Sequence, residues 1–109
     1  MEFGNIVLLS ELQDPSMTSK TTVRVFGHIA HIDLTARSCQ ICHKNDFLDI
    51  RVDFVDLASY KIGDLCSFIG IIDFGEHPIF MHAKTITKAN GLDMGLLEEA
   101  LLRRRVFLS

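Results

Sequence analysis

The chain has 109 residues, of which 48% are hydrophobic, so it can bury one core but has no room for a second domain. Its formal net charge is −3, whereas a domain that grips nucleic acid strongly by itself is usually basic, so any nucleic-acid binding is expected to be weak or shared. The first twelve residues lack the features of a secretory signal, and no segment approaches the ~20 apolar residues of a membrane span. With an odd count of three cysteines, the composition favours a soluble protein of a reducing compartment with no membrane contact.

Five segments are predicted as strands, after an apolar stretch at residues 5–12 and a polar approach at residues 13–20. They span residues 21–33, 37–43, 48–53, 63–74 and 79–87. Apolar and polar residues alternate in the first and third, which is typical of strands with one buried face, whereas the fourth is apolar at most positions. Gly27 lies in the middle of the long first segment, where a strand that bends sharply can use a missing side chain. Residues 54–61 are predicted as a short helix or turn.

Residues 93–108 are predicted to form an amphipathic helix, with Asp93 as its N-cap and basic residues 103–105 near its C-terminus. At 100° per residue its apolar side chains form one arc of roughly 160°. The arc consists of Met94, Leu96, Leu97, Ala100, Leu101, Phe107 and Leu108. A helix that only caps a small barrel needs a narrower stripe, so the sequence predicts that a partner chain covers the surplus. The alternative is that the helix caps its own barrel and leaves Leu102 and Val106 exposed.

Five strands with a short helical link between the third and the fourth are typical of the OB fold, an all-β, five-stranded barrel. The long first strand fits this architecture, since in such a barrel it must serve both sheets. An SH3-like barrel is the main alternative, but it would leave the terminal helix unexplained. We therefore expect an N-terminal segment at residues 1–20 and an OB-fold domain at residues 21–109, which ends in the partner-binding helix at residues 93–108.

Four short motifs follow one another along most of the chain. They are Arg-Val-Phe-Gly at residues 24–27, Ile-Gly-Asp-Leu-Cys-Ser-Phe-Ile-Gly at residues 62–70, Ala83, and Gly-Leu-Asp-Met-Gly-Leu-Leu-Glu-Glu-Ala-Leu at residues 91–101. In this order they resemble the smallest (Ten-type) subunit of the CST complex, which binds single-stranded telomeric DNA ends. The smallest subunit of replication protein A is similar in plan, with a barrel followed by an apolar helix, and is the alternative family. The first twenty residues lie outside the resemblance.

The resemblance implies a non-catalytic OB-fold subunit that heterodimerises, helix to helix, with a larger Stn-type subunit and reaches the large CST subunit through it. Its implied role is telomere capping, C-strand fill-in and replication, at the telomere of the chromosome in the nucleus. The expected partner surface combines positions that match the family with residues of the apolar arc. These are Arg24, Leu92, Met94, Leu97, Leu101, Phe107 and Leu108.

OB grooves bind single strands by stacking bases on aromatic rings and by following the backbone with cations. The outward residues of this type predicted for the barrel are His28, Arg37, Arg51, Phe80, His82 and Lys84. Aromatic residues make up only 8% of the chain, tryptophan is absent, and Asp49 and Asp53 flank Arg51 on the same face. The groove is therefore expected to bind single-stranded DNA weakly or together with other subunits, and Arg24 is assigned to the partner instead.

The string Cys39-Gln-Ile-Cys42-His43 matches the haem-attachment pattern, but neither an export signal nor a haem-sized cavity is visible in the sequence. On a strand, residues three apart point to opposite faces, so Cys39 and Cys42 are not expected to converge. Zinc held by both cysteines, His43 and either His28 or His31 remains an alternative, and it would make the chain a small metal- or redox-sensing barrel. The sequence pairs no nucleophile with a base and has no glycine-rich phosphate loop, so we expect no catalysis, no cofactor and no resident metal.

Overall fold

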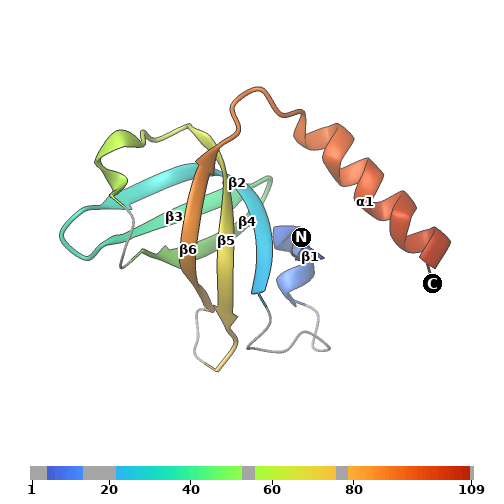
Figure 1. Ribbon diagram of the computed structural model, residues 1–109, viewed down its shortest axis with the longest axis horizontal. Helices are drawn as coiled ribbons and strands as arrows, with labels where there is room; N and C mark the ends of the chain where they lie inside the picture. The colour runs from blue at the N-terminus through green and yellow to red at the C-terminus, as the bar shows by residue number, and fades with distance from the viewer. Residues whose placement is uncertain (1–4, 14–21, 53–55, 76–78, 109) are drawn as a thin grey trace.

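The computed structural model of the chain describes residues 5–13, 22–52, 56–75 and 79–108 (Figure 1). Its elements in chain order are β1 (Asn5–Ile6), the 3-10 helix η1 (Leu9–Gln13), β2 (Thr22–Asp33), β3 (Ser38–His43), β4 (Asp46–Arg51), the 3-10 helix η2 (Leu57–Ser59), β5 (Leu65–Asp73), β6 (Phe80–Lys88) and the helix α1 (Met94–Leu108). Each of the five segments predicted as strands overlaps one of the strands β2 to β6. Within the described ranges, no helix combines the length and the apolarity needed to cross a membrane.

Strands β2 to β6 form one closed sheet in the order β2-β3-β4-β6-β5, which returns to β2. Neighbouring strands are antiparallel except for β4 and β6, which run parallel with Asp49 opposite Phe80. The short β1 adds a parallel strand beside β2, with Asn5 opposite Val23. The predicted all-β, five-stranded OB barrel is confirmed, and Figure 1 shows α1 leaving it after β6.

The closure depends on β2, which pairs with two neighbours. Its first half, from Thr22 to His28, pairs with β5, and its second half, from His28 to Asp33, pairs with β3. Gly27 lies just before the change of partner, and a Cβ atom there would lie 3.0 Å from Cδ1 of Ile41 in β3. The missing side chain therefore lets β2 and β3 approach closely where the strand bends.

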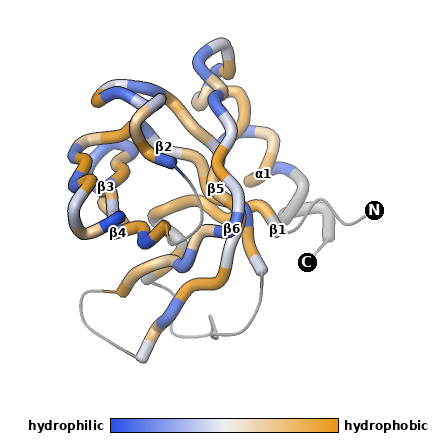
Figure 2. Tube along the Cα trace, turned by 60° about the vertical axis from the view of Figure 1, so that its left-hand side comes forward, coloured by the Kyte–Doolittle hydropathy of each residue, from blue (hydrophilic) through white to orange (hydrophobic). Residues whose placement is uncertain are grey.

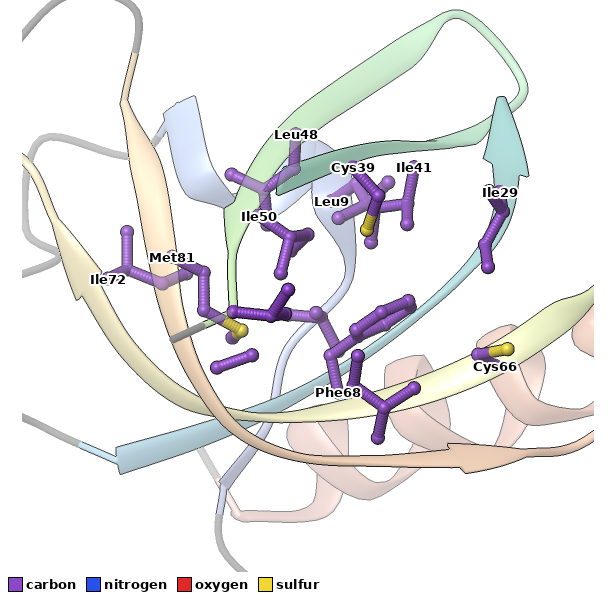
Figure 3. Close-up of a cluster of buried hydrophobic side chains, with 14 of the residues drawn as sticks. Leu9, Ile29, Cys39, Ile41, Leu48, Ile50, Cys66, Phe68, Ile72 and Met81 are labelled. Carbon is purple, nitrogen blue, oxygen red and sulfur yellow. The ribbon is translucent and has the colours of Figure 1, made fainter. Parts of the chain in front are cut away.

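Inward-facing side chains of the barrel strands meet in one hydrophobic core (Figure 3). The largest fully buried side chains are those of Phe68, Ile29, Ile41, Leu48, Ile50, Met81, Val25, Val52 and Cys66. Three residues of the N-terminal segment, Val7, Leu9 and Leu12, are buried in the same core. Burial of a side chain of this size is worth roughly 1.5–3 kcal/mol, so residues 5–13 contribute directly to the stability of the barrel.

Gly70 in β5 lies where this strand closely approaches β6. A Cβ atom there would clash with the carbonyl oxygen of His82 and would lie 2.8 Å from Cα of Ala83, both in β6. These backbone atoms cannot move aside without disturbing the β5–β6 pairing. Gly70→Ala is therefore expected to lower the free energy of unfolding by at least ~2 kcal/mol, measured by urea denaturation followed by circular dichroism.

Gly91→Ala is the matched control, because a Cβ atom at Gly91 would meet no atom within 4 Å. Its free energy of unfolding is expected to stay within ~0.5 kcal/mol of the wild-type value. Equal stability of the two variants would contradict the close approach of β5 and β6.

Candidate interaction surfaces

The connection from β6 to α1 is fixed by hydrogen bonds at both of its ends. The backbone N–H of Ala89 donates to the carbonyl oxygen of Leu65 at 2.7 Å, and Oδ1 of Asn90 accepts from the N–H of Leu65 at 2.8 Å. Asp93 then caps the helix, since its Oδ1 accepts from the N–H of Leu96 at 3.1 Å. The chain that leads into α1 is therefore held against the first residue of β5, and α1 begins four residues after Asn90.

The leucines of α1 lie on two opposite sides of the helix. Leu101 is 7% exposed, and Met94 and Leu97 are half-buried, so this inner side faces into the chain. Leu96 and Leu102 are 65% and 51% exposed. At 100° per residue, the midpoint between these two exposed leucines lies roughly 160° from Leu101. Of the arc predicted from the sequence, Leu101 thus faces inward and Leu96 is exposed, while Leu102, which lies outside that arc, is exposed as the alternative interpretation predicted.

A third exposed leucine, Leu92, precedes the helix and is 36% exposed. We call the exposed set the outer leucines, which are Leu92, Leu96 and Leu102. Both overall views place α1 on the same side of the barrel as β1 (Figures 1 and 2). Of the predicted partner surface, Leu92 is therefore exposed and Leu101 is buried within the chain, while the side chains of Phe107 and Leu108 lie outside the described residues.

One acidic side chain connects α1 to the barrel. Glu98 accepts hydrogen bonds from Nε2 of His43 at 3.2 Å and from Nζ of Lys44 at 3.1 Å, each on a different carboxylate oxygen. His43 ends β3, and Lys44 lies in the turn to β4. Both hydrogen bonds lower the pKa of the Glu98 carboxyl below its usual value, and the one from His43 has the larger effect. We call these two contacts the Glu98 bridge.

Arg24, the residue of the first strand predicted to face the partner, lies in β2 between Ile6 of β1 and Ile69 of β5. Its neighbours Val23 and Val25 point into the core, so Arg24 lies on the outer face of the barrel, half-buried. Within the described part of the chain, its buried Nε–H has no hydrogen-bond acceptor. Buried donors are nearly always paired in folded proteins, so this one can still take an acceptor.

Three of the predicted nucleic-acid residues come together on neighbouring strands. The guanidinium carbon of Arg51 in β4 lies 3.8 Å from the centre of the Phe80 ring in β6, which is a cation–π contact. The His82 ring meets the same ring edge-on, with the centres 4.8 Å apart and 74° between the planes. Because Phe80 is only 4% exposed, its ring supports Arg51 and His82 and offers no face to a base.

The remaining predicted nucleic-acid residues are exposed at different places around this group. Arg37 lies in the β2–β3 turn, next to Ser38, which pairs with Arg51. Lys84 is exposed further along β6, and His28 is exposed on β2. The cations therefore spread over β4, β6 and one turn instead of forming a single dense patch.

Acidic residues were a reason to expect weak binding at this groove. Asp49 is half-buried in β4, and its Oδ1 accepts from Nε2 of Gln40 at 3.3 Å. This hydrogen bond occupies part of the carboxylate but leaves its charge in place, so Asp49 still opposes a phosphate near Arg51. Asp53, the other acidic residue expected there, lies outside the described residues.

A β-bulge in β2 adds a histidine that alternation did not predict on the outer face. Ala30 is an extra residue between the pairs that Ile29 and His31 make with β3. His28 and His31 are three residues apart, a spacing that separates faces on a regular strand, yet both are exposed. Nothing in the sequence marks this bulge.

Phe47 at the start of β4 is an exposed aromatic residue that the sequence analysis missed. Its side chain is 58% exposed, and it pairs with Cys42, which in turn pairs with His28 across the outer face. A signal for it was available, because an inward Leu48 and Ile50 imply an outward Phe47. The outer face therefore carries an exposed aromatic ring, that of Phe47, which a ligand can reach.

The two cysteines of the Cys-x-x-Cys-His string lie on opposite sides of β3, as strand geometry predicts. Cys39 is buried in the core (Figure 3), and Cys42 is half-exposed. Burial raises the pKa of the Cys39 thiol to about 12 and that of the buried Cys66 to about 11. Among the side chains that the structure describes, no group of three or more His, Cys, Asp or Glu could hold a metal ion.

Comparison with known proteins gives one family and several similar folds. A family model described as a telomere-capping, CST complex subunit (Ten1_2) matches residues 1–109, including the first twenty. The crystal structure of the S. pombe Stn1-Ten1 complex is similar with a TM-score of 0.79 and 10% identity, over 95% of this chain and 93% of that chain. Telomere capping protein Ten1 from Saccharomyces pombe gives 0.78 and 11% identity, over 94% and 97% of the two chains.

A protein from another setting has a related fold. The hypothetical protein YgiW from E. coli gives a TM-score of 0.62 and 16% identity, over 79% of this chain and 91% of its own. The comparison with curated proteins found no match. At such low identities the structural matches establish the OB fold, and the family model identifies the family.

The three thiols are expected to differ sharply in reactivity. Cys42 should react with iodoacetamide in the folded protein, whereas Cys39 and Cys66 should react only after unfolding, because burial blocks access and disfavours the thiolate. Alkylation at pH 8 followed by peptide mass spectrometry measures each site. Cys42→Ser should remove the fast reaction, and modification of Cys39 as fast as that of Cys42 would contradict the assigned faces of β3.

Proposed function

We propose that this chain, which belongs to the family of telomere-capping subunits of the CST complex, pairs through α1 with a larger Stn-type OB-fold subunit. Through that partner it joins the large CST subunit and acts at telomeres in the nucleus, where it supports capping, C-strand fill-in and replication. Its own part is non-catalytic. It stabilises the partner and supplies a minor share of the surface that contacts single-stranded DNA. The similar fold of S. pombe Ten1, solved in complex with Stn1, supports this pairing.

The exposed side of α1 is the observation that carries the proposal. The helix has 15 residues and is about 22 Å long, and the outer leucines lie along it and just before it. A row of exposed leucines on a fixed helix is typical of a protein interaction site. An interface of ordinary size needs roughly 800 Å² from each partner, which one helix side and a strand edge together can supply.

Arg24 offers a second, polar element of the same interface. Its Nε–H is buried without an acceptor among the described residues. Arg24 lies on the outer face of the barrel next to β1, on the side where α1 also lies. A carboxylate or carbonyl of the partner would complete this hydrogen bond. Such charge-assisted bonds fix orientation more than they add affinity, so Arg24 would set the angle at which the partner docks.

Contact with single-stranded DNA is assigned to the exposed cations Arg37, Arg51 and Lys84, together with His28 and His82. Phe80 acts indirectly, because its buried ring holds the Arg51 guanidinium from below. The net charge of −3 and the nearby Asp49 keep this contribution small. The DNA surface is therefore one that the assembled complex shares.

A double substitution at the exposed leucines tests the partner surface. Leu96→Glu with Leu102→Glu should weaken binding to the purified Stn-type subunit by at least ~100-fold, since two charges would enter an apolar interface. The chain alone should keep its thermal midpoint, because both side chains are exposed. Isothermal titration calorimetry and a thermal melt measure the two effects.

Two further variants give this experiment its controls. Leu34→Glu changes a leucine that is 61% exposed in the β2–β3 turn, away from α1, and should leave partner binding unchanged. Leu101→Glu should lower the stability of the chain itself, because Leu101 is buried without any partner. Wild-type affinity in the double variant would rule out the outer leucines as the interface.

The DNA surface is tested in the assembled heterodimer. Arg51→Ala and Lys84→Ala should leave assembly intact and weaken binding of a single-stranded oligonucleotide by about two- to fivefold each, with a shallower salt dependence. Lys61→Ala, which removes an exposed cation outside this group, is the control. Fluorescence anisotropy at several salt concentrations measures the affinities. A loss of affinity much larger than this would make the groove the principal DNA site and would contradict a minor contribution.

A further inference from the structure

Apolar burial alone does not determine which side of α1 packs on the barrel. The helix carries two neighbouring leucine pairs, Leu96 with Leu97 and Leu101 with Leu102. Leu97 and Leu101 lie close together around the helix, and Leu96 and Leu102 flank the opposite side, so rotating α1 by about half a turn would bring Leu96 and Leu102 inward in place of Leu97 and Leu101. Either orientation would place two leucines against the barrel, so apolar burial favours docking of the helix in both.

The Glu98 bridge distinguishes these two orientations. Glu98 lies roughly 60° from Leu101 around the helix, on the inner side, and its carboxylate reaches both His43 and Lys44. Rotation that brought Leu96 and Leu102 inward would carry Glu98 away from both donors. The position of Lys44 is itself fixed by the turn, where its φ of 56° is a left-handed backbone conformation. The bridge is therefore an oriented contact between a rigid hairpin end and one side of α1.

The neighbouring acidic residue makes a different contact. Glu99 pairs with Arg103 one helical turn later, so this interaction lies within α1 and is indifferent to how the helix docks. Glu98, by contrast, bonds to Lys44 and His43, which precede it by 54 and 55 positions in the sequence. The hydrogen bonds from His43 and Lys44 lower the pKa of the Glu98 carboxyl, so it is ionised at neutral pH, and the bridge is lost only as the pH falls through that lowered pKa.

We propose that Glu98 is a positioning residue, whose bridge to His43 and Lys44 selects the side of α1 that docks on the barrel and so leaves the outer leucines exposed for a partner. The selection of the docked side stands on the contacts within this chain. The consequence for a partner rests on the proposed function. A helix that is already docked in the binding orientation loses less freedom on association, and this raises affinity without any added contact.

The docked side can be read directly from the leucine methyl groups in the full-length chain. With methyl-labelled leucine and a soluble gadolinium chelate, the methyl signals of Leu96 and Leu102 should broaden strongly, and those of Leu101 should be protected. Glu98→Gln keeps the side-chain size and removes the charge, and it should reduce this contrast by about half as a second docked orientation becomes populated. Glu99→Gln is the matched control and should retain the wild-type contrast.

A charge exchange separates orientation from simple loss of stability. Glu98→Lys combined with Lys44→Glu restores opposite charges across the same gap and should recover much of the contrast, whereas Glu98→Lys alone should not. An unchanged contrast in Glu98→Gln, or an equal loss in Glu99→Gln, would overturn the inference. Neither outcome depends on a partner being identified.

Affinity for the purified Stn-type subunit tests the second part of the proposal, which links the docked side of α1 to partner binding. Glu98→Gln should weaken binding by about two- to fivefold, in proportion to the fraction of molecules that present the outer leucines. Wild-type affinity together with a lost leucine contrast would overturn the link between docking and partner binding. Failure of the wild-type chain to bind that subunit would overturn the proposed function, and the methyl contrast would still decide the role of Glu98.

Discussion

The double pairing of β2 is the constraint on which the other features of this molecule depend. One strand hydrogen-bonds to β5 over its first half and to β3 over its second, so it converts a curved sheet into a closed barrel. Gly27 lies next to the change of partner, where a Cβ atom would lie only 3.0 Å from Cδ1 of Ile41. Closure removes the exposed strand edges that would otherwise pair with other chains. It also creates an inside and an outside, and the outward residues of the barrel strands, such as Arg24 and Arg51, owe their positions to that division.

The terminal helix obeys a different physical rule from the barrel. The barrel is determined by hydrogen-bond register, which admits one arrangement, whereas α1 packs by apolar burial, which admits more than one. Hydrogen bonds at Asn90 and Asp93 fix where the helix starts, and the Glu98 bridge fixes how it is turned. In the proposed pairing, the partner binds the side of α1 that the barrel leaves uncovered. A subunit built in this way keeps its fold and its docking surface on separate residues.

The sequence alone predicts the elements well, because period-two alternation and a capped apolar helix are local signals. It predicts less about which side chains are accessible. The bulge at Ala30 turns His31 outward, and Arg51 covers Phe80, yet both depend on residues far away in the sequence. The apolar arc of α1 was also ambiguous, since the helical projection does not say which half of a wide arc meets the barrel. Phe47 is the exception, because alternation within β4 was enough to place it outside.

The N-terminal segment has a consequence for how the chain is made. Val7, Leu9 and Leu12 pack among core residues that reach as far along the chain as Ile86 in β6. The ring of strands is complete only when β6 joins β4 to β5. Val7, Leu9 and Leu12 are therefore synthesised long before the core into which they pack is complete. During that interval the nascent chain carries these apolar residues exposed, and exposed apolar segments are what chaperones bind. Closure of this barrel therefore requires that β6 has been synthesised.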